Sequence, residues 1–215
     1  AAEAALLSAF VNTGQLCVSC SRLLVEASVA ADFEAMIVER SKKIKLGDPR
    51  NNDTLVGPMI TSGQYEIALK YLADAGSDGR QVLCGGGKAD ISGDCANGFW
   101  LQPTIISGVK PGMPLHDEEI FGPVLVMIPY EDVDDAVAMA NDTVYGLAGY
   151  VQGPEEDARK VANRIRAGQV LVNGARPDFT APFGGYGQSG NGREWGELGM
   201  EEFLEVKAVI GYAAA

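Results

Sequence analysis

The sequence has a single histidine, His116, and only four cysteines, Cys17, Cys20, Cys84 and Cys95, among its 215 residues. One histidine excludes a metal site built from several imidazoles, and any Ser-His-Asp triad would have to use it. Four irregularly spaced cysteines are too few for a disulfide framework in a chain of this length. A reducing, cytoplasmic setting is therefore expected, with no metal.

Positive charge is also scarce, since 17 Lys and Arg face 29 Asp and Glu and give a net charge of −12. An acidic chain repels phosphate backbones, so nucleic acid is not an expected partner. No run approaches the ~18 uncharged apolar residues of a membrane-spanning helix. The N-terminus lacks a basic region followed by an apolar block, so neither a signal peptide nor a membrane association is expected.

Apolar residues make up 47% of the chain and glycine contributes 27 residues. This supply of apolar side chains is enough for a sizeable core and excludes a wholly disordered chain or a coiled coil. The length suits one large domain or two small ones. The chain starts without Met inside a helix-forming stretch, which suggests a fragment or a processed piece.

Apolar spacing predicts helices over residues 2–11, 65–72, 131–140 and 155–167. A further helix is expected after Asp32, which would cap it, with an apolar face made of Phe33, Met36, Ile37 and Ile44. Short apolar runs predict strands over 21–25, 81–84, 101–106, 124–129, 148–152, 169–173 and 203–212. Strands alternate with helices from 124 to 173, and continuous apolar centres are typical of strands buried on both faces. The pattern indicates an α/β fold with right-handed crossovers, with residues 174–199 irregular.

Two short motifs are weak on their own. Residues 185–190 match G-x-G-x-x-G, but a loop precedes them, whereas a dinucleotide-binding loop needs a strand before and a helix after. The Cys17-x-x-Cys20 pair follows a helix and precedes a strand, the reverse of a redox pair. A tight glycine loop and a pair of unlinked thiols are the expected alternatives.

Two further segments carry candidate chemistry. His116 stands beside three acids and is expected to face solvent. Glu119 precedes Phe121-Gly122-Pro123 and a buried strand, so a turn could hold this carboxylate rigidly, or it could be a plain surface acid. Cys17 lies in a turn between a helix and a strand, where it is either a reactive thiol or a buried structural cysteine.

Taken together and in order, the motifs resemble the NAD(P)-dependent aldehyde dehydrogenase superfamily. The resemblance covers essentially the whole chain. The matching segments are Phe10-Val11-Asn12-Thr13-Gly14-Gln15-Leu16-Cys17, Arg22, Gly47-Asp48-Pro49, Gly57-Pro58, Gly85-Gly86-Gly87, residues 98–104, residues 118–124, Asn141, Thr143, residues 145–147, Val172-Asn173, residues 182–186, Ser189-Gly190 and residues 192–194.

The resemblance implies a reaction. Cys17 would attack an aldehyde to give a thiohemiacetal, a hydride would pass to NAD or NADP, and water would hydrolyse the resulting thioester to a carboxylic acid. The backbone N–H of Cys17 would be one oxyanion-hole donor. By the same resemblance Glu119 would accept hydrogen bonds from the nicotinamide ribose, Phe121 would pack beside it, and Gln64 would contact the cofactor.

Further expectations concern substrate and assembly. Leu16 and Val18, beside the thiol, and the aromatic residues Phe179 and Phe183 would line the pocket of a small-molecule aldehyde. The resemblance implies a three-layer, doubly wound, mostly parallel sheet over residues 1–200. Residues 201–215 would be a C-terminal assembly strand and tail that joins subunits into a homo-oligomer, a dimer or a tetramer.

The chain also departs from the family pattern. The general-base Glu, the second oxyanion-hole residue and most of the cofactor-binding domain would lie upstream of the sixteen residues that precede Cys17. Gly187 stands where many members carry Lys. Two hypotheses follow: the chain is the catalytic half of an aldehyde dehydrogenase, active only with its cofactor domain, or it is an inactive fragment or paralogue that acts as an assembly module.

Overall fold

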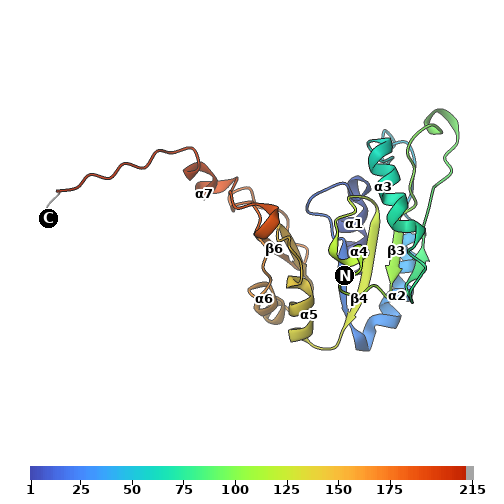
Figure 1. Ribbon diagram of the computed structural model, residues 1–215, viewed down its shortest axis with the longest axis horizontal. Helices are drawn as coiled ribbons and strands as arrows, with labels where there is room; N and C mark the ends of the chain where they lie inside the picture. Colours follow the sequence, from blue (N-terminus) through green and yellow to red (C-terminus); the bar gives the residue numbers. More distant parts are fainter. Residues whose placement is uncertain (212–215) are drawn as a thin grey trace.

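The structure is a computed structural model that describes residues 1–211. Figure 1 shows two units side by side, followed by an extended C-terminal segment. We call residues 1–130 the large unit and residues 131–202 the small unit. No helix within the described residues is both long enough and apolar enough to cross a membrane.

The large unit is built on a four-stranded sheet with the order β1-β4-β3-β2. Strands β1 and β3 run parallel to β4, and β2 runs antiparallel to β3. Its elements are α1 (Ala2–Phe10), η1 (Val11–Gly14), β1 (Arg22–Glu26), α2 (Ala27–Ser41), α3 (Ser62–Ala73), β2 (Gln81–Cys84), η2 (Gly93–Cys95), β3 (Thr104–Ser107), α4 (Pro114–Asp117) and β4 (Val124–Tyr130).

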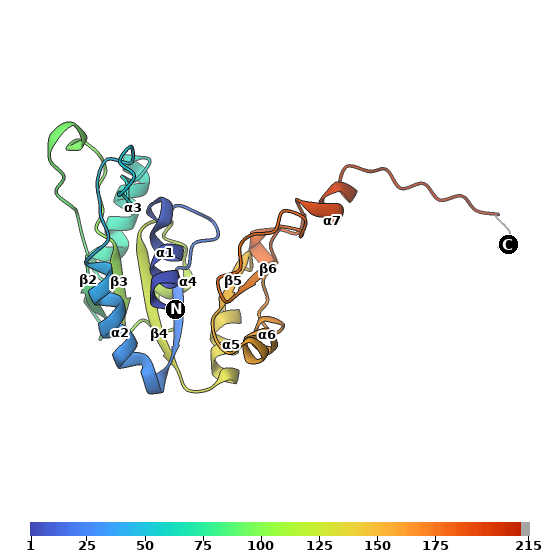
Figure 2. The same ribbon diagram turned by 180° about the vertical axis from the view of Figure 1, so that it is seen from behind.

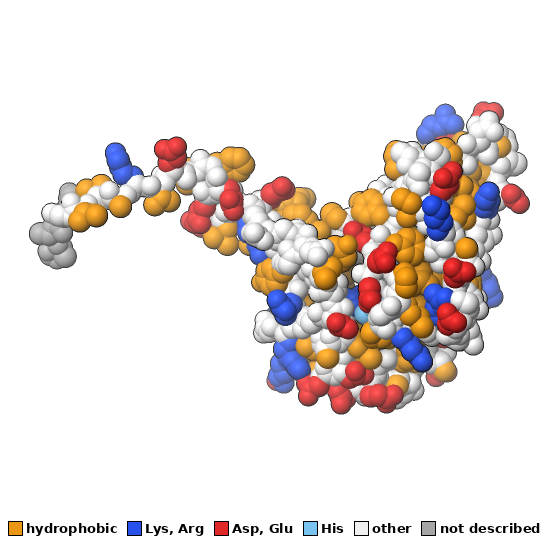
Figure 3. Space-filling view, in the orientation of Figure 1, with side chains coloured by type: hydrophobic (Ala, Val, Ile, Leu, Met, Phe, Trp, Pro, Cys, Tyr) orange, Lys and Arg blue, Asp and Glu red, His pale blue; other side chains and the backbone are white. Residues whose placement is uncertain are grey.

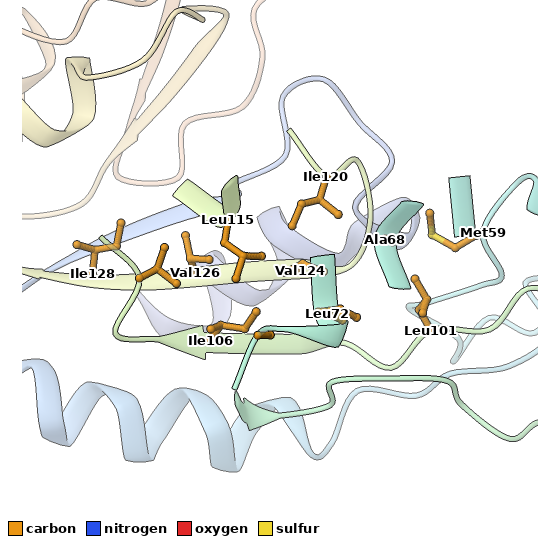
Figure 4. Packing of buried hydrophobic residues seen from close by; sticks show 12 residues of the cluster. Met59, Ala68, Leu72, Leu101, Ile106, Leu115, Ile120, Val124, Val126 and Ile128 are labelled. Carbon is orange, nitrogen blue, oxygen red and sulfur yellow. The ribbon is translucent and has the colours of Figure 1, made fainter. Parts of the chain in front are cut away.

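Strand β4 lies at the centre of the core because its residues are buried on both faces of the sheet. Val124, Val126 and Ile128 pack with α3 and α4 in one cluster, part of which Figure 4 shows. Leu125 and Met127, which point to the opposite face, pack with α1 and α2 in a second cluster. The sheet therefore separates two helical layers, and a period of two along one strand supplies both cores.

The small unit contains α5 (Val133–Asn141), β5 (Ala148–Val151), α6 (Glu155–Ala162), β6 (Gln169–Val172), η3 (Gly187–Ser189) and α7 (Gly196–Glu201). Asp132 caps α5, since its carboxylate accepts a 2.9 Å hydrogen bond from the backbone N–H of Asp135. Strands β5 and β6 pair in parallel and form a sheet of their own. Figure 2 shows the small unit and the extended segment from behind.

The expectation of an α/β fold with mostly parallel strands is confirmed, but the single continuous sheet is wrong. The alternation after residue 124 predicted that β5 and β6 would join the sheet of β4. Strands β5 and β6 pair with each other instead of adding to the outer edge of β1, so the small unit has a sheet of its own.

Two helix boundaries also differ from the sequence pattern. Helix α2 begins at Ala27, directly after β1, and has no side-chain cap, so Asp32 lies inside the helix. The alanines of its first turns need no cap to favour a helix. Helix α6 ends at Ala162, because the Asn141 side chain binds the backbone of Arg164 and Arg166 at 2.9 and 2.7 Å and holds it outside the helix.

The expected strand over 203–212 is absent from the described residues, and Tyr212 lies outside them. Residues 205–211 pair with no sheet, and Phe203, Val206 and Ile210 are 84%, 98% and 95% exposed. Figure 3 shows hydrophobic side chains along the C-terminal segment, which extends away from both units. A strand needs a neighbouring edge for its backbone hydrogen bonds, and this segment meets none.

Arg22 joins the two units. Its half-buried guanidinium donates hydrogen bonds of 3.0 Å to the carbonyls of Met139 and Ala140, in the last turn of α5. The last carbonyls of a helix lack the usual donor one turn further on, and here the Met139 carbonyl accepts from the cap residue Asp142, at 3.3 Å, besides Arg22. A cation is also favourable at this end of the helix dipole. The first residue of β1 thus caps a helix of the small unit.

We expect Arg22→Met to lower the free energy of unfolding by about 1.5–3 kcal/mol, because hydrogen bonds to a charged donor are lost while most of the stem is kept. Urea denaturation measures this change, and hydrogen exchange should locate the loosened amides at the end of α5. The matched control is Arg50→Met, whose exposed guanidinium pairs with Asp48, and which should leave stability nearly unchanged. Equal effects of the two substitutions would contradict the role of Arg22.

Candidate active site

Two loops meet at the amino ends of neighbouring parallel strands. Residues 11–21 lead into β1, residues 118–123 lead into β4, and Arg22 lies opposite Val126 in the pairing of these strands. Gly14 lies against the second loop with φ +67°, and a Cβ at this position would lie 2.2 Å from the Gly122 carbonyl oxygen. Only glycine permits this approach and this backbone conformation.

Cys17 lies in a tight turn over residues 16–19, which we call the Cys17 turn. The Ser19 N–H donates a 3.0 Å hydrogen bond to the Leu16 carbonyl, so Cys17 occupies the first central position of a β-turn. The turn is fixed to α1 by a 3.2 Å hydrogen bond from the Cys20 N–H to the Ser8 carbonyl. This arrangement leaves Cys17 exposed.

The residues before the turn hold an uncommon backbone conformation. Asn12 and Thr13 have φ of +52° and +62°, which is rare for residues with a side chain. The Thr13 hydroxyl donates to the Gly57 carbonyl at 3.1 Å, and the Gln15 side-chain oxygen accepts from the Ile60 N–H at 2.9 Å. Residues 57–60 thus secure a strained segment next to the exposed thiol, as is common at functional sites.

The two thiols of the C-x-x-C pair differ. Burial raises the pKa of Cys20 to about 11, and the Cys20 sulfur is 3.5 Å from the Arg22 carbonyl oxygen. A thiol of this kind stays protonated and unreactive near neutral pH. Cys17 is exposed, and all four cysteines, each within the described residues, are free. The sequence left Cys17 as either a reactive thiol or a buried structural cysteine. Its exposure favours the first of these alternatives.

Glu119 and Phe121 lie on the second loop, which we call the Glu119 loop (residues 118–122). Glu119 is exposed, but the surrounding chain removes enough water to raise the pKa of its carboxyl above the ordinary 4.5, with no hydrogen bond contributing. Phe121 has φ +56° and is 37% exposed. Both side chains are thus presented outward by a loop whose backbone is constrained.

Helix α3 holds the Glu119 loop in place. The Gln64 side-chain amide donates to the carbonyls of Ile120 and Phe121 at 2.6 and 3.4 Å. The Tyr71 hydroxyl donates to the Glu118 carboxylate, which raises the pKa of Tyr71 to about 12. The resemblance implied that Gln64 contacts the cofactor, and this stays a prediction; in the structure its amide nitrogen binds loop carbonyls. Tyr71 had no sequence signal beyond its place on the helix.

A cavity of about 30 Å³ lies between the Cys17 turn and the Glu119 loop. It is lined by Leu16, Cys20 and Arg22 from one side and by Glu119 and Phe121 from the other. Residues about 100 positions apart in the sequence therefore share one site. This volume suits a single water-sized group. The cavity is therefore a small gap between the two loops and is too small to be a substrate pocket.

The expectation that His116 faces solvent is wrong. His116 is 4% exposed, and its Nδ1 lies 2.5 Å from the Asp117 carboxylate. Helix α4 turns Leu115 and His116 toward the core together, so the neighbouring acids remain outside while the imidazole is buried. Within residues 1–211 no three His, Cys, Asp or Glu side chains lie close enough to hold a metal ion.

Phe179 and Phe183 pack on Trp195, and we call these three residues the aromatic cluster. The ring centroids of Phe179 and Trp195 are 4.7 Å apart, as are those of Phe183 and Trp195. Phe183 and Glu194 exchange two backbone hydrogen bonds of 2.7 Å, which place Trp195 beside the two phenylalanines. Trp195 carries no signal in the sequence because its role depends on this pairing.

The glycine loop over 185–190 does not have dinucleotide-binding geometry, as expected. It contains the short turn η3, and no helix opens at Gly190. Gly187 has φ +58°, and a Cβ there would lie 2.5 Å from the Val144 carbonyl oxygen. A lysine at this position would thus require a shift of the backbone.

Residues 1–209 match the model of the aldehyde dehydrogenase family. The chain belongs to this family. It is 48% identical over 204 residues to a 3-succinoylsemialdehyde-pyridine dehydrogenase of a Pseudomonas species, covering 94% of the chain and 42% of that protein. It is 45% identical to a putative aldehyde dehydrogenase of Staphylococcus saprophyticus, covering 99% of the chain and 44% of that protein.

Solved structures give the same result. A cysteine-to-alanine variant of aldehyde dehydrogenase C from Pseudomonas syringae, in complex with NAD⁺ and octanal, matches with a TM-score of 0.93 and 42% identity, over 100% of this chain and 44% of that one. Betaine aldehyde dehydrogenase from Staphylococcus aureus, in complex with NAD⁺, matches with a TM-score of 0.90 and 37% identity, over 95% and 41%. The chain thus spans less than half the length of these relatives.

We expect iodoacetamide to alkylate Cys17 first and Cys20 last among the four thiols of the 215-residue chain. At pH 8 only about one Cys20 thiol in a thousand would be ionised, and the thiolate is the reacting form. Peptide mass spectrometry over a time course gives the order. Labelling of Cys20 ahead of Cys17 would contradict the assignment of the accessible thiol.

Proposed function

We propose that this chain is the thiol-bearing catalytic part of an NAD(P)-dependent aldehyde dehydrogenase, which oxidises a small aldehyde to a carboxylic acid. The observation that carries the proposal is the cavity that the turn of the exposed Cys17 shares with the Glu119 loop, next to the close approach of Gly14 to Gly122, in a chain that belongs to this family. A full-length enzyme that contains this sequence is the proposed active species, and the chain by itself is expected to be inactive.

In the proposed reaction, Cys17 as a thiolate attacks the aldehyde carbon and a C–S bond forms. The carbonyl oxygen becomes an oxyanion, which the backbone N–H of Cys17 stabilises. The nicotinamide cofactor, when bound, supplies the two-electron acceptor that turns the thiohemiacetal carbon into a thioester. Water then adds to the thioester, the C–S bond breaks, and the acid leaves with Cys17 restored.

The residues present fit the cofactor. Glu119 has no hydrogen bond that contributes to its pKa shift, so its carboxylate is available to accept from two neighbouring hydroxyls of a ribose. Phe121 offers a partly exposed ring on the same loop. Two relatives are solved with NAD⁺, which supports NAD, while NADP stays open. Gln64 would act by holding the loop.

Leu16, Val18, Phe179 and Phe183 are proposed to line the aldehyde pocket. Leu16 and Val18 flank Cys17 in its turn, and the two phenylalanines belong to the aromatic cluster. The octanal bound to the Pseudomonas syringae relative is apolar apart from its aldehyde group. The four side chains proposed to line the pocket are apolar as well. An apolar or partly aromatic aldehyde is therefore the proposed substrate class.

We also propose that residues 1–200 form the catalytic domain and that residues 201–215 assemble subunits into a homo-oligomer. The exposed apolar side chains of residues 203–210 support this, because they would be covered if the segment joined a sheet edge of a partner. The general base, the second oxyanion-hole donor and the cofactor domain would come from the upstream part of a longer chain. The four free cysteines are consistent with a cytoplasmic location.

The first test replaces the nucleophile. In a full-length enzyme, Cys17→Ser should abolish aldehyde oxidation and leave NAD affinity within about twofold, because a hydroxyl is a far weaker nucleophile than a thiolate near neutral pH. Cys95→Ser, which changes a thiol outside the two loops, is the matched control and should keep full activity. Aldehyde-dependent NADH formation and cofactor titration measure the two effects. Retained oxidation by Cys17→Ser would favour the inactive-module hypothesis or another nucleophile.

The second test concerns Glu119. Glu119→Gln keeps the shape but removes the charge and part of the acceptor capacity, so NADH formation should slow by about tenfold or more through poorer cofactor positioning. Ester hydrolysis by Cys17, which needs no hydride acceptor, should change little. In the parent enzyme, cofactor affinity should fall as pH drops through the raised pKa of Glu119, because protonation removes the acceptor.

Glu156→Gln, on exposed α6, is the control and should leave both rates and this pH dependence unchanged. Loss of ester hydrolysis with intact NADH formation would assign Glu119 to the thiol rather than to the cofactor.

A further inference from the structure

Tyr150 lies on β5 in the small unit, yet its side chain reaches the Cys17 turn of the large unit. Its hydroxyl donates a 2.7 Å hydrogen bond to the carbonyl of Val18, 132 positions earlier in the chain. Figures 1 and 2 both show the loop between α1 and β1 extending toward the sheet of β5 and β6. The contact therefore joins the residue that follows Cys17 to a separate sheet.

The position of Val18 makes this bond informative. The Ser19 N–H closes the turn by donating to the Leu16 carbonyl, and the Val18 carbonyl is the other end of the same planar peptide group. The Tyr150 hydroxyl therefore holds the second side of the peptide that closes the turn. A peptide fixed at both its N–H and its carbonyl limits the movement of the turn that carries the thiol.

Ser8 completes the arrangement from α1. Its carbonyl accepts from the Cys20 N–H at 3.2 Å, and its side chain lies close enough to the Tyr150 phenol to influence the pKa of that group. One helical residue thus holds the end of the Cys17 turn and also lies beside the tyrosine that binds Val18. Two elements, α1 and β5, therefore hold the turn from two sides.

The phenol also lies close to the thiols. Burial, and then the charges of Cys20 and Cys17, raise the pKa of Tyr150, while the neighbouring Ser8 side chain opposes this shift. The hydroxyl therefore stays protonated at neutral pH and remains a donor when Cys17 ionises.

We propose that Tyr150 is a positioning residue for Cys17: through the Val18 carbonyl it fixes the direction in which the Cys17 thiol and its N–H point. The inference rests on the proposed function. It adds a residue of the small unit to the machinery of a nucleophile in the large unit. The basis is geometric, since misplacement of a nucleophile by about 1 Å can cost about a hundredfold in rate.

The test is Tyr150→Phe in a full-length enzyme, since the ring is kept and only the hydroxyl is lost. We expect kcat for ester hydrolysis and for NADH formation to fall together by about tenfold, with KM and cofactor affinity within about twofold, because positioning acts on the chemical step. Tyr130→Phe, at the far end of β4, is the matched control and should leave kcat unchanged.

A second variant keeps the test decisive if Tyr150→Phe folds poorly. Ser8→Ala removes the hydroxyl beside the Tyr150 phenol but keeps the Ser8 carbonyl, so it should lower kcat in the same direction and add little to Tyr150→Phe in the double variant. Unchanged kcat in Tyr150→Phe, a loss confined to KM, or an equal loss in Tyr130→Phe would overturn the inference. Activity retained by Cys17→Ser would instead overturn the proposed function, whatever Tyr150 does.

Discussion

The contact of Gly14 with the Gly122 carbonyl is the constraint on which the candidate site depends. A side chain at position 14 would clash with that carbonyl at 2.2 Å, so the backbone approach exists only because this residue lacks a Cβ. The approach brings the turn with the exposed thiol against the loop with Glu119 and Phe121. Strands β1 and β4 pair in parallel, and each loop leads directly into one of them. The pairing therefore places both loops at the same end of the sheet.

The sequence was sufficient for features set by local pattern. The spacing of Tyr65, Ala68 and Leu72 predicts α3, and the unbroken apolar run from 124 predicts the buried strand β4. Cys17, Glu119 and Phe121 could be proposed because each stands in a motif with its own neighbours. The separate sheet of β5 and β6 could not be foreseen, because the local pattern of a strand does not say which other strand it pairs with.

Other features were beyond the sequence because they depend on contacts between distant residues. His116 has acidic neighbours in the chain, yet the short α4 directs it into the core. Gln64 binds carbonyls 56 and 57 positions away, and Tyr150 binds one 132 positions away. Such bonds leave no periodic trace in the sequence. The exposed segment after α7 looks like a strand by composition, but a strand also needs a partner edge, and composition does not encode one.

The contacts of Arg22 and of Tyr150 between the units have a shared consequence for folding. Arg22 binds the end of α5, and Tyr150, ten residues beyond Ala140, binds Val18, four residues before Arg22. The two contacts and the short chain segments between them form a closed ring. Closing such a small ring costs little entropy once one contact is made, so each bond favours the other. Separation of the two units requires the loss of both contacts. The units should therefore unfold together, in one cooperative transition, although they have separate sheets.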